Sequence, residues 1–137
     1  MSNKVEIVAE ISGNHNGSIN RAKELISAAK ESGADRAKIQ TYTPETITID
    51  CERPQFMVDQ DHKLWGGRSL YSPYREAHTP WEWHEELFSH AKSVGINLFS
   101  TPFDPTAVKF LEGFGVELYK IASLRSEEHT SELQSQR

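Results

Sequence analysis

Short apolar runs alternate along this chain with segments of helical periodicity, and three of the runs carry a charged side chain near their C-terminal end. These runs lie at residues 5–11, 37–41 and 118–123. Their charged residues are Glu10, Lys38 and Lys120. Burying an unpaired charge is costly, so each of these groups needs a partner or a ligand. Charged residues at the carboxyl ends of parallel strands are typical of binding sites in βα folds.

The order of the expected elements is β-α-β-α-β-α-β. We expect strands near residues 5–11, 37–41, 97–100 and 117–122. We expect helices from Ser18 to Gly33, from a capping box at residues 79–82 to Gly95, and from residue 104 to Gly113 or Gly115. This order predicts an α/β fold of about four parallel strands with right-handed crossover helices.

The connection at residues 42–78 is unusually long for such a fold. It contains one expected short helix, near residues 70–76. Connections of this length are usually functional, as lids or partner surfaces.

Four strands do not close a barrel, because a (β/α)₈ domain typically needs about 250 residues. We therefore interpret residues 1–124 as the truncated, N-terminal half of a TIM barrel. A complete flavodoxin-like domain would need a covered fifth strand, and the remaining residues 125–137 do not offer one.

Residues 125–137 hold one apolar residue in thirteen and follow no period of strand or helix. They also resemble the in-frame translation of a sequencing-library adapter. We expect this stretch to be a non-native tail, with a natural polar tail as the alternative.

Composition excludes several classes of partner. The net charge is −5 and no basic run is present, which argues against nucleic-acid binding. No apolar stretch approaches the roughly 20 residues of a membrane span, and no signal peptide is recognisable. The single cysteine, Cys51, excludes an internal disulfide and fits a reducing cytoplasm.

Strand alternation places Lys38 and Gln40 on one face, pointing into the mouth of the barrel. Glu10 and Lys120 are expected to face the same way, close to the hydroxyl groups of Thr101 and Ser123. Two lysines with hydroxyl donors suit a phosphate or a carboxylate. The alternative is that each lysine only forms a structural ion pair with Glu10.

The histidines give a weaker signal. His15 lies in the first βα loop, where it is a candidate base, ligand or loop-bracing donor. His78, His84 and His90 are six residues apart, a spacing that does not keep them on one helical face. We expect these three at the surface or at helix ends, with no metal cluster. No dinucleotide or P-loop signature is present.

Four segments together resemble the N-terminal half of the sialic acid (nonulosonic acid) synthase family. They are residues 9–18, 37–42, 100–103 and 119–123. Within that family, residues 42–47, 64–66 and 77–84 are most similar to pseudaminic acid synthases.

The resemblance implies a condensation of phosphoenolpyruvate with an open-chain amino-sugar aldehyde, with release of phosphate. It implies phosphoenolpyruvate binding by Lys38, Thr101, Lys120 and Ser123. Glu10 and Gln40 match positions on the side of the sugar and the reacting carbon, and His15 is a third catalytic candidate.

The resemblance also implies a divalent metal, Mn²⁺ or Mg²⁺, whose ligands lie outside this chain, and a full-length homodimer. We expect the fragment alone to be inactive and poorly soluble. Synthesis of N-acetylneuraminate or legionaminate is the nearest alternative. A non-catalytic module that binds a small ligand or a protein is the alternative from another class.

Overall fold

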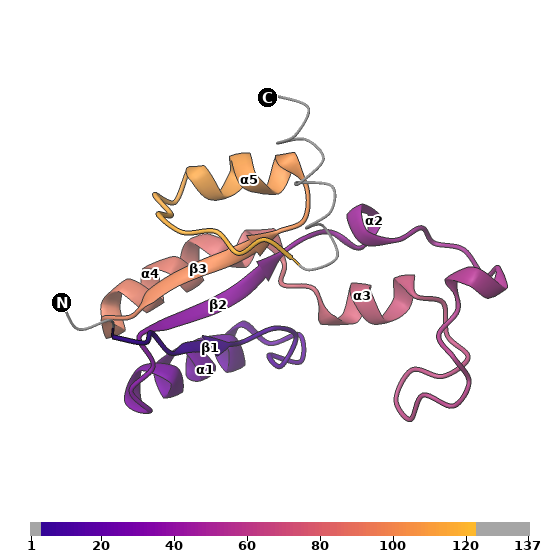
Figure 1. Cartoon of the computed structure of the whole chain (residues 1–137), viewed down its shortest axis with the longest axis horizontal. Helices are drawn as coiled ribbons and strands as arrows, with labels where there is room; N and C mark the ends of the chain where they lie inside the picture. The colour runs from indigo at the N-terminus through magenta and orange to yellow at the C-terminus, as the bar shows by residue number, and fades with distance from the viewer. Residues whose placement is uncertain (1–3, 123–137) are drawn as a thin grey trace.

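A computed structural model describes residues 4–122 of the 137-residue chain. The predicted domain boundary at residue 124, the predicted tail at 125–137 and Ser123 lie outside the described residues. The strands are β1 (Val8–Glu10), β2 (Arg36–Thr41) and β3 (Asn97–Pro102). The α-helices are α1 (Ile19–Glu31), α2 (Pro44–Ile47), α3 (Tyr71–Ala77), α4 (His84–Val94) and α5 (Pro105–Glu112), as Figure 1 shows.

The three strands form one parallel sheet in the order β1-β2-β3, which confirms the parallel arrangement predicted for the first three strands. The register pairs Glu10 with Lys38 and Gln40 with Thr101. Side chains of register partners share a face, so these four residues lie on the same side of the sheet.

The predicted strand at residues 117–122 is wrong as far as it is described. This segment makes one isolated parallel bridge, between Tyr119 and Ser100. The apolar side chains of Leu118 and Ile121 are 40% and 53% exposed. Strands gain most of their stability from packing against neighbours, and these side chains find little to pack on.

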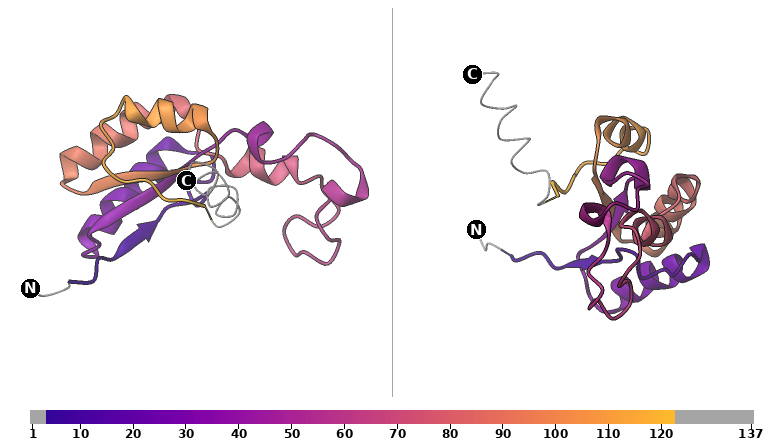
Figure 2. Two further views of the ribbon diagram at one scale, coloured as in Figure 1. Left: turned by 45° about the horizontal axis from the view of Figure 1, so that its top comes forward. Right: turned by 90° about the vertical axis from the view of Figure 1, so that its right-hand side faces the viewer.

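The core lies between the sheet and two helices. Ala37 and Ile39 of β2 are fully buried against Ile26 of α1 and Leu87 of α4. Helices α1, α4 and α5 lie along one side of the sheet (Figure 2). Residues 116–122 run beside β3, to which Tyr119 is joined by its bridge with Ser100. The polar face of β2 is therefore turned away from the helices, as strand alternation predicts.

Two of the expected helix starts are confirmed and one is wrong. Ser18 accepts a hydrogen bond from the Arg21 N–H at 3.2 Å, and Asp104 caps α5 in the same way. The predicted capping box at residues 79–82 does not form. Trp81–Trp83 instead makes a 3₁₀ turn, and α4 begins at His84, because the hydroxyl of Thr79 is bonded elsewhere.

The long connection at residues 42–78 projects past the carboxyl ends of the strands (Figure 1). Helix α3 confirms the short helix predicted there. A single antiparallel bridge joins Met57 to Ser69, and the guanidinium of Arg68 lies 5.2 Å from the centre of the Trp65 ring.

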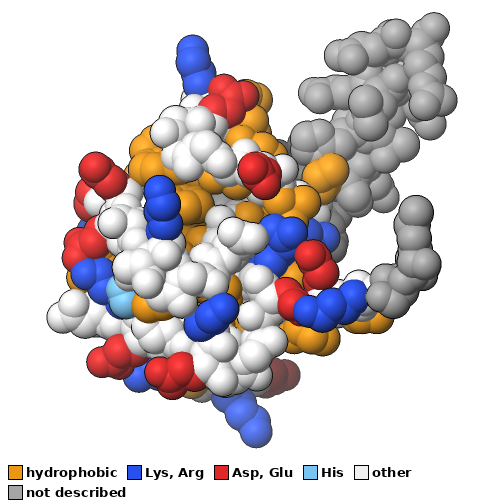
Figure 3. Space-filling view, turned by 90° about the vertical axis from the view of Figure 1, so that its left-hand side faces the viewer, with side chains coloured by type: hydrophobic (Ala, Val, Ile, Leu, Met, Phe, Trp, Pro, Cys, Tyr) orange, Lys and Arg blue, Asp and Glu red, His pale blue; other side chains and the backbone are white. Residues whose placement is uncertain are grey.

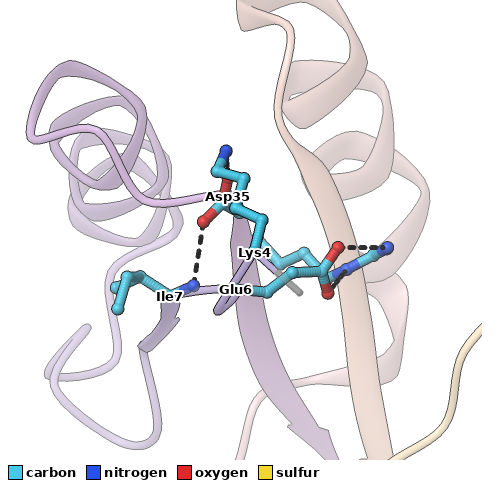
Figure 4. A network of polar contacts seen from close by, with 5 residues as sticks. Lys4, Glu6, Ile7 and Asp35 are labelled. Carbon is cyan, nitrogen blue, oxygen red and sulfur yellow. Dashed lines mark hydrogen bonds and ion pairs between the residues drawn. The ribbon is translucent and has the colours of Figure 1, made fainter. Parts of the chain in front are cut away.

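The opposite end of the sheet is held by ion pairs. Lys4 contacts Asp35 at 2.9 Å, and the Ile7 N–H donates to the same carboxylate at 2.9 Å (Figure 4). Arg36 pairs with Glu6 at 3.0 Å. Figure 3, which views this end, shows charges of both signs among hydrophobic side chains. These contacts fix β1 against β2 far from the carboxyl edge.

Within residues 4–122, no helix has both the length and the hydropathy that crossing a bilayer requires.

Candidate functional site

Lys38 is the centre of a polar cluster near the carboxyl ends of the strands. Its ammonium forms an ion pair with Glu10 on β1 and lies 3.3 Å from the hydroxyl of Thr101 on β3. The Lys38 side chain is 14% exposed, whereas that of Glu10 is 42% exposed. The alternative of a structural ion pair is therefore realised in part, but the lysine also reaches the hydroxyl of a third strand. A partly buried ammonium beside a hydroxyl suits a small anion.

Gln40 joins this cluster by register. It is half-buried and pairs with Thr101 on the same face of the sheet. Its side chain therefore stands on the same face of the sheet as those of Lys38 and Thr101.

Lys120 is placed next to the cluster but not in contact with it. The bridge between Ser100 and Tyr119 places Lys120 next in register to Thr101. Its backbone N–H donates to the Ser100 carbonyl at 3.1 Å. Its side chain is exposed and makes no hydrogen bond or ion pair with residues 4–122. The structure thus brings together Glu10, Lys38 and Thr101, and gives the Lys120 ammonium no partner among the described residues.

His15 occupies a buried position away from these contacts. Its Nδ1 accepts a hydrogen bond from the Gly17 N–H at 3.1 Å, so its Nε2 donates to Thr79 Oγ1, also at 3.1 Å. Its ring packs edge-on against Trp83, and burial lowers the pKa of the imidazole. Both nitrogens are occupied, which is the geometry of a loop-bracing residue, one of the three roles left open for it.

His84 is predicted at the surface or at a helix end. It does begin α4, but its side chain is fully buried. Its Nδ1 donates to the Pro80 carbonyl at 3.1 Å and its Nε2 lies 2.8 Å from Thr41 Oγ1. Thr41 Oγ1 is in turn 2.6 Å from Ser100 Oγ. The ring of Phe110 packs edge-on against the imidazole. Burial lowers the pKa of His84 to about 4, so the ring is neutral near pH 7.

Sequence reasoning missed this network. The available signal was Thr41, which stands on the same strand face as Ala37 and Ile39. A polar residue that continues an apolar face needs a buried hydrogen-bond partner.

No three His, Cys, Asp or Glu side chains within residues 4–122 are arranged to hold a metal ion. The described residues therefore do not fit the divalent metal that the resemblance implies, and its ligands would have to come from elsewhere.

The chain matches the model of the NeuB family over residues 25–131. It is 46% identical over 123 residues to the pseudaminic acid synthase of Campylobacter jejuni, covering 90% of this chain and 35% of the relative. It is 46% identical to the pseudaminic acid synthase of Helicobacter pylori, over 86% of this chain and 34% of the relative. It is 37% identical to the N,N'-diacetyllegionaminic acid synthase of Legionella pneumophila, over 85% of this chain and 32% of the relative.

A solved structure is similar as well. The crystal structure of the N-acetylneuraminic acid synthetase of Leptospira borgpetersenii matches with a TM-score of 0.75 and 27% identity, over 93% of this chain and 39% of that one. This match confirms the expected α/β fold class. The chain spans about a third of the length of the curated relatives it matches. By sequence and fold, this chain belongs to the NeuB family.

Proposed function

We propose that the full-length enzyme carrying this segment condenses phosphoenolpyruvate with an open-chain amino-sugar aldehyde, and that its product is a pseudaminic acid. The observation that carries the proposal is the position of Lys38, which reaches both Glu10 and Thr101 from the strand between them. Membership of the NeuB family supports the reaction class.

The reaction forms one carbon–carbon bond and releases one phosphate. The methylene carbon of phosphoenolpyruvate attacks the aldehyde carbon, and the aldehyde oxygen takes a proton to become a hydroxyl. Water adds at the carbon that carried the phosphate, and inorganic phosphate leaves. Fixed cations and hydroxyl donors stabilise the negative charge that develops during these steps.

In this scheme Lys38 and Thr101 bind phosphoenolpyruvate, and Lys120 and Ser123 complete the anion site. The exposed ammonium of Lys120 is then available to close on the bound anion. Glu10 and Gln40 face the aldehyde. Binding of the anion draws Lys38 away from Glu10, which frees the carboxylate to accept a hydrogen bond from the sugar.

The sequence identities to the relatives favour pseudaminic acid as the product over related sugars. They are 46% for the Campylobacter jejuni pseudaminic acid synthase and 33% for the N,N'-diacetyllegionaminic acid synthase of the same organism. They are 34% for the mouse N-acetylneuraminate-9-phosphate synthase.

A divalent metal, Mn²⁺ or Mg²⁺, and a homodimeric assembly are further parts of the proposal, taken from the family resemblance. A cytoplasmic location is another part, which the single cysteine favours. The metal would polarise the aldehyde. Its ligands are not among residues 4–122, so no step above depends on it.

The test is a chimera in which residues 1–122 replace the matching segment of the Campylobacter jejuni pseudaminic acid synthase. We expect the chimera to release phosphate from phosphoenolpyruvate only when an amino sugar is present. The parent synthase is the positive control, and the parent without its matching segment is the negative control. A chimera that folds as the parent does but releases no phosphate would refute the proposal.

We also propose that residues 125–137 are a non-native tail. The family match extends to residue 131 and thus into this stretch. Reading the source DNA past codon 124 in independent clones decides the question, because a natural tail would recur in every clone.

A further inference from the structure

We propose that three buried side chains behind the candidate site form a network that positions its phosphate-binding residues. The three are Thr41, Ser100 and His84. This inference rests on the proposed function and deepens it, since none of the three faces the ligand.

The network lies directly behind the candidate site. Thr41 follows Gln40 on β2, and Ser100 precedes Thr101 on β3. Because side chains alternate along a strand, Gln40 and Thr101 point to the ligand side while Thr41 and Ser100 point to the helices. The contact of 2.6 Å between the two buried hydroxyls therefore ties the two strands together where the ligand residues stand.

Ser100 also connects the network to Lys120. Its carbonyl accepts the backbone N–H of Lys120 at 3.1 Å, and it forms the isolated bridge with Tyr119. Within residues 4–122 this bridge is the β pairing that holds residues 116–122 to the sheet. The position of Lys120 thus depends on the position of Ser100.

The Pro80 carbonyl at one end of the network determines which group donates in the hydrogen bonds of His84 and Thr41. The Pro80 carbonyl can only accept, so His84 Nδ1 carries the proton and its Nε2 accepts from the Thr41 hydroxyl. The Thr41 oxygen then accepts from the Ser100 hydroxyl at 2.6 Å, and this hydroxyl shares its single proton with the Ile39 carbonyl, to which it also donates at 3.2 Å. His84 begins α4, so the chain of hydrogen bonds anchors both strands to the start of a helix.

The experiment compares Thr41→Val, which removes the hydroxyl at similar volume, with Thr41→Ser, which keeps it. In the chimera we expect Thr41→Val to raise the KM for phosphoenolpyruvate about three- to tenfold, the range of one lost hydrogen bond. The KM for the sugar and kcat should change less, and Thr41→Ser should restore the original KM. Ile26→Val, in the core of α1, is the control for lost stability alone, and it should lower Tm without changing this KM.

An equal KM in Thr41→Val and Thr41→Ser would overturn the inference, as would a rise of the same size in Ile26→Val. Amide hydrogen exchange in the folded chimera gives a second readout that does not need turnover. The amide of Lys120 should exchange faster in Thr41→Val than in Thr41→Ser, and equal protection would overturn the positioning role. An inactive chimera with the expected exchange difference would refute the proposed function and leave the network supported.

Discussion

The ammonium of Lys38 lies 3.3 Å from the hydroxyl of Thr101 on the neighbouring strand, although the two residues are 63 positions apart in the sequence. The parallel register makes this contact possible, because it pairs Lys38 with Phe99 and so places Thr101 two residues further towards the carboxyl edge. A flexible lysine can then bridge from β2 to the last residues of β3.

Replacing Lys38 with Ala in the chimera should raise the KM for phosphoenolpyruvate at least about tenfold, since a hydrogen bond to a charged group contributes about 1.5–3 kcal/mol. The fold should survive, because the unpaired Glu10 keeps 42% of its side chain in solvent. Steady-state kinetics with varied phosphoenolpyruvate measures the effect, and circular dichroism checks the fold. Lys38→Arg keeps the charge and should raise the KM for phosphoenolpyruvate less than Lys38→Ala does. Unchanged kinetics in Lys38→Ala would remove this residue from the site.

Replacing Glu10 with Gln should affect the reaction of the sugar but not the binding of phosphoenolpyruvate. The carboxylate competes with the anion for Lys38, so its removal should not raise the KM for phosphoenolpyruvate. The rate with the sugar should fall, because Glu10 is proposed to face the aldehyde. The free energy of unfolding should change by about 1 kcal/mol, because the carboxylate end of this ion pair is open to solvent. A raised KM for phosphoenolpyruvate with an unchanged rate would contradict the proposed division of roles.

Much of the fold was predictable because its signals are local. Helix caps such as Ser18 and Asp104 act on the backbone next to them, and the order of strands and helices forces a parallel sheet. Strand alternation also placed Lys38 and Gln40 on the face of β2 that is turned away from the helices. These inferences need only the residues of one element and its neighbours.

The errors arose where a side chain is committed to a distant partner. Thr79 reads as a helix cap from its neighbours, but its hydroxyl is bonded to His15, 64 positions away. His84 reads as a surface residue from its spacing, but the packing of β2 against α4 buries it beside Thr41. Such pairings depend on tertiary contacts that no short-range pattern encodes.

The stability of the chimera should fall in acid partly through His84. Burial lowers the pKa of this group from 6.5 to about 4 in the folded state, so the unfolded chain binds the extra proton between these values. The free energy of unfolding should therefore be highest above pH 6.5, decrease as the pH falls towards 4, and level off below that. The full difference is about 3 kcal/mol, at 1.36 kcal/mol for each pKa unit.

Urea unfolding at several pH values measures this dependence in the chimera and in its His84→Gln variant. Gln keeps a donor and an acceptor but does not titrate in this range. The difference in pH slope between the two proteins isolates the histidine, because the carboxylates that also titrate in acid are common to both. Equal slopes between pH 4 and 6.5 would show that His84 is not held in its neutral form.

Gly13 is the position where the first βα loop should tolerate a side chain least. A Cβ atom added there would lie 2.9 Å from the Ala77 Cβ and 3.1 Å from the Ala77 carbonyl oxygen, at the end of α3. Gly13→Ala should therefore lower the free energy of unfolding by about 1–3 kcal/mol, as overpacking does. Ala77→Gly removes the closer of the two contacts, so the double variant should be less destabilised than the sum of the single variants. Denaturant unfolding of the four proteins measures this coupling. Strict additivity would mean that the loop moves freely away from α3, and that the contact between them does not hold the residues that follow Glu10 in place.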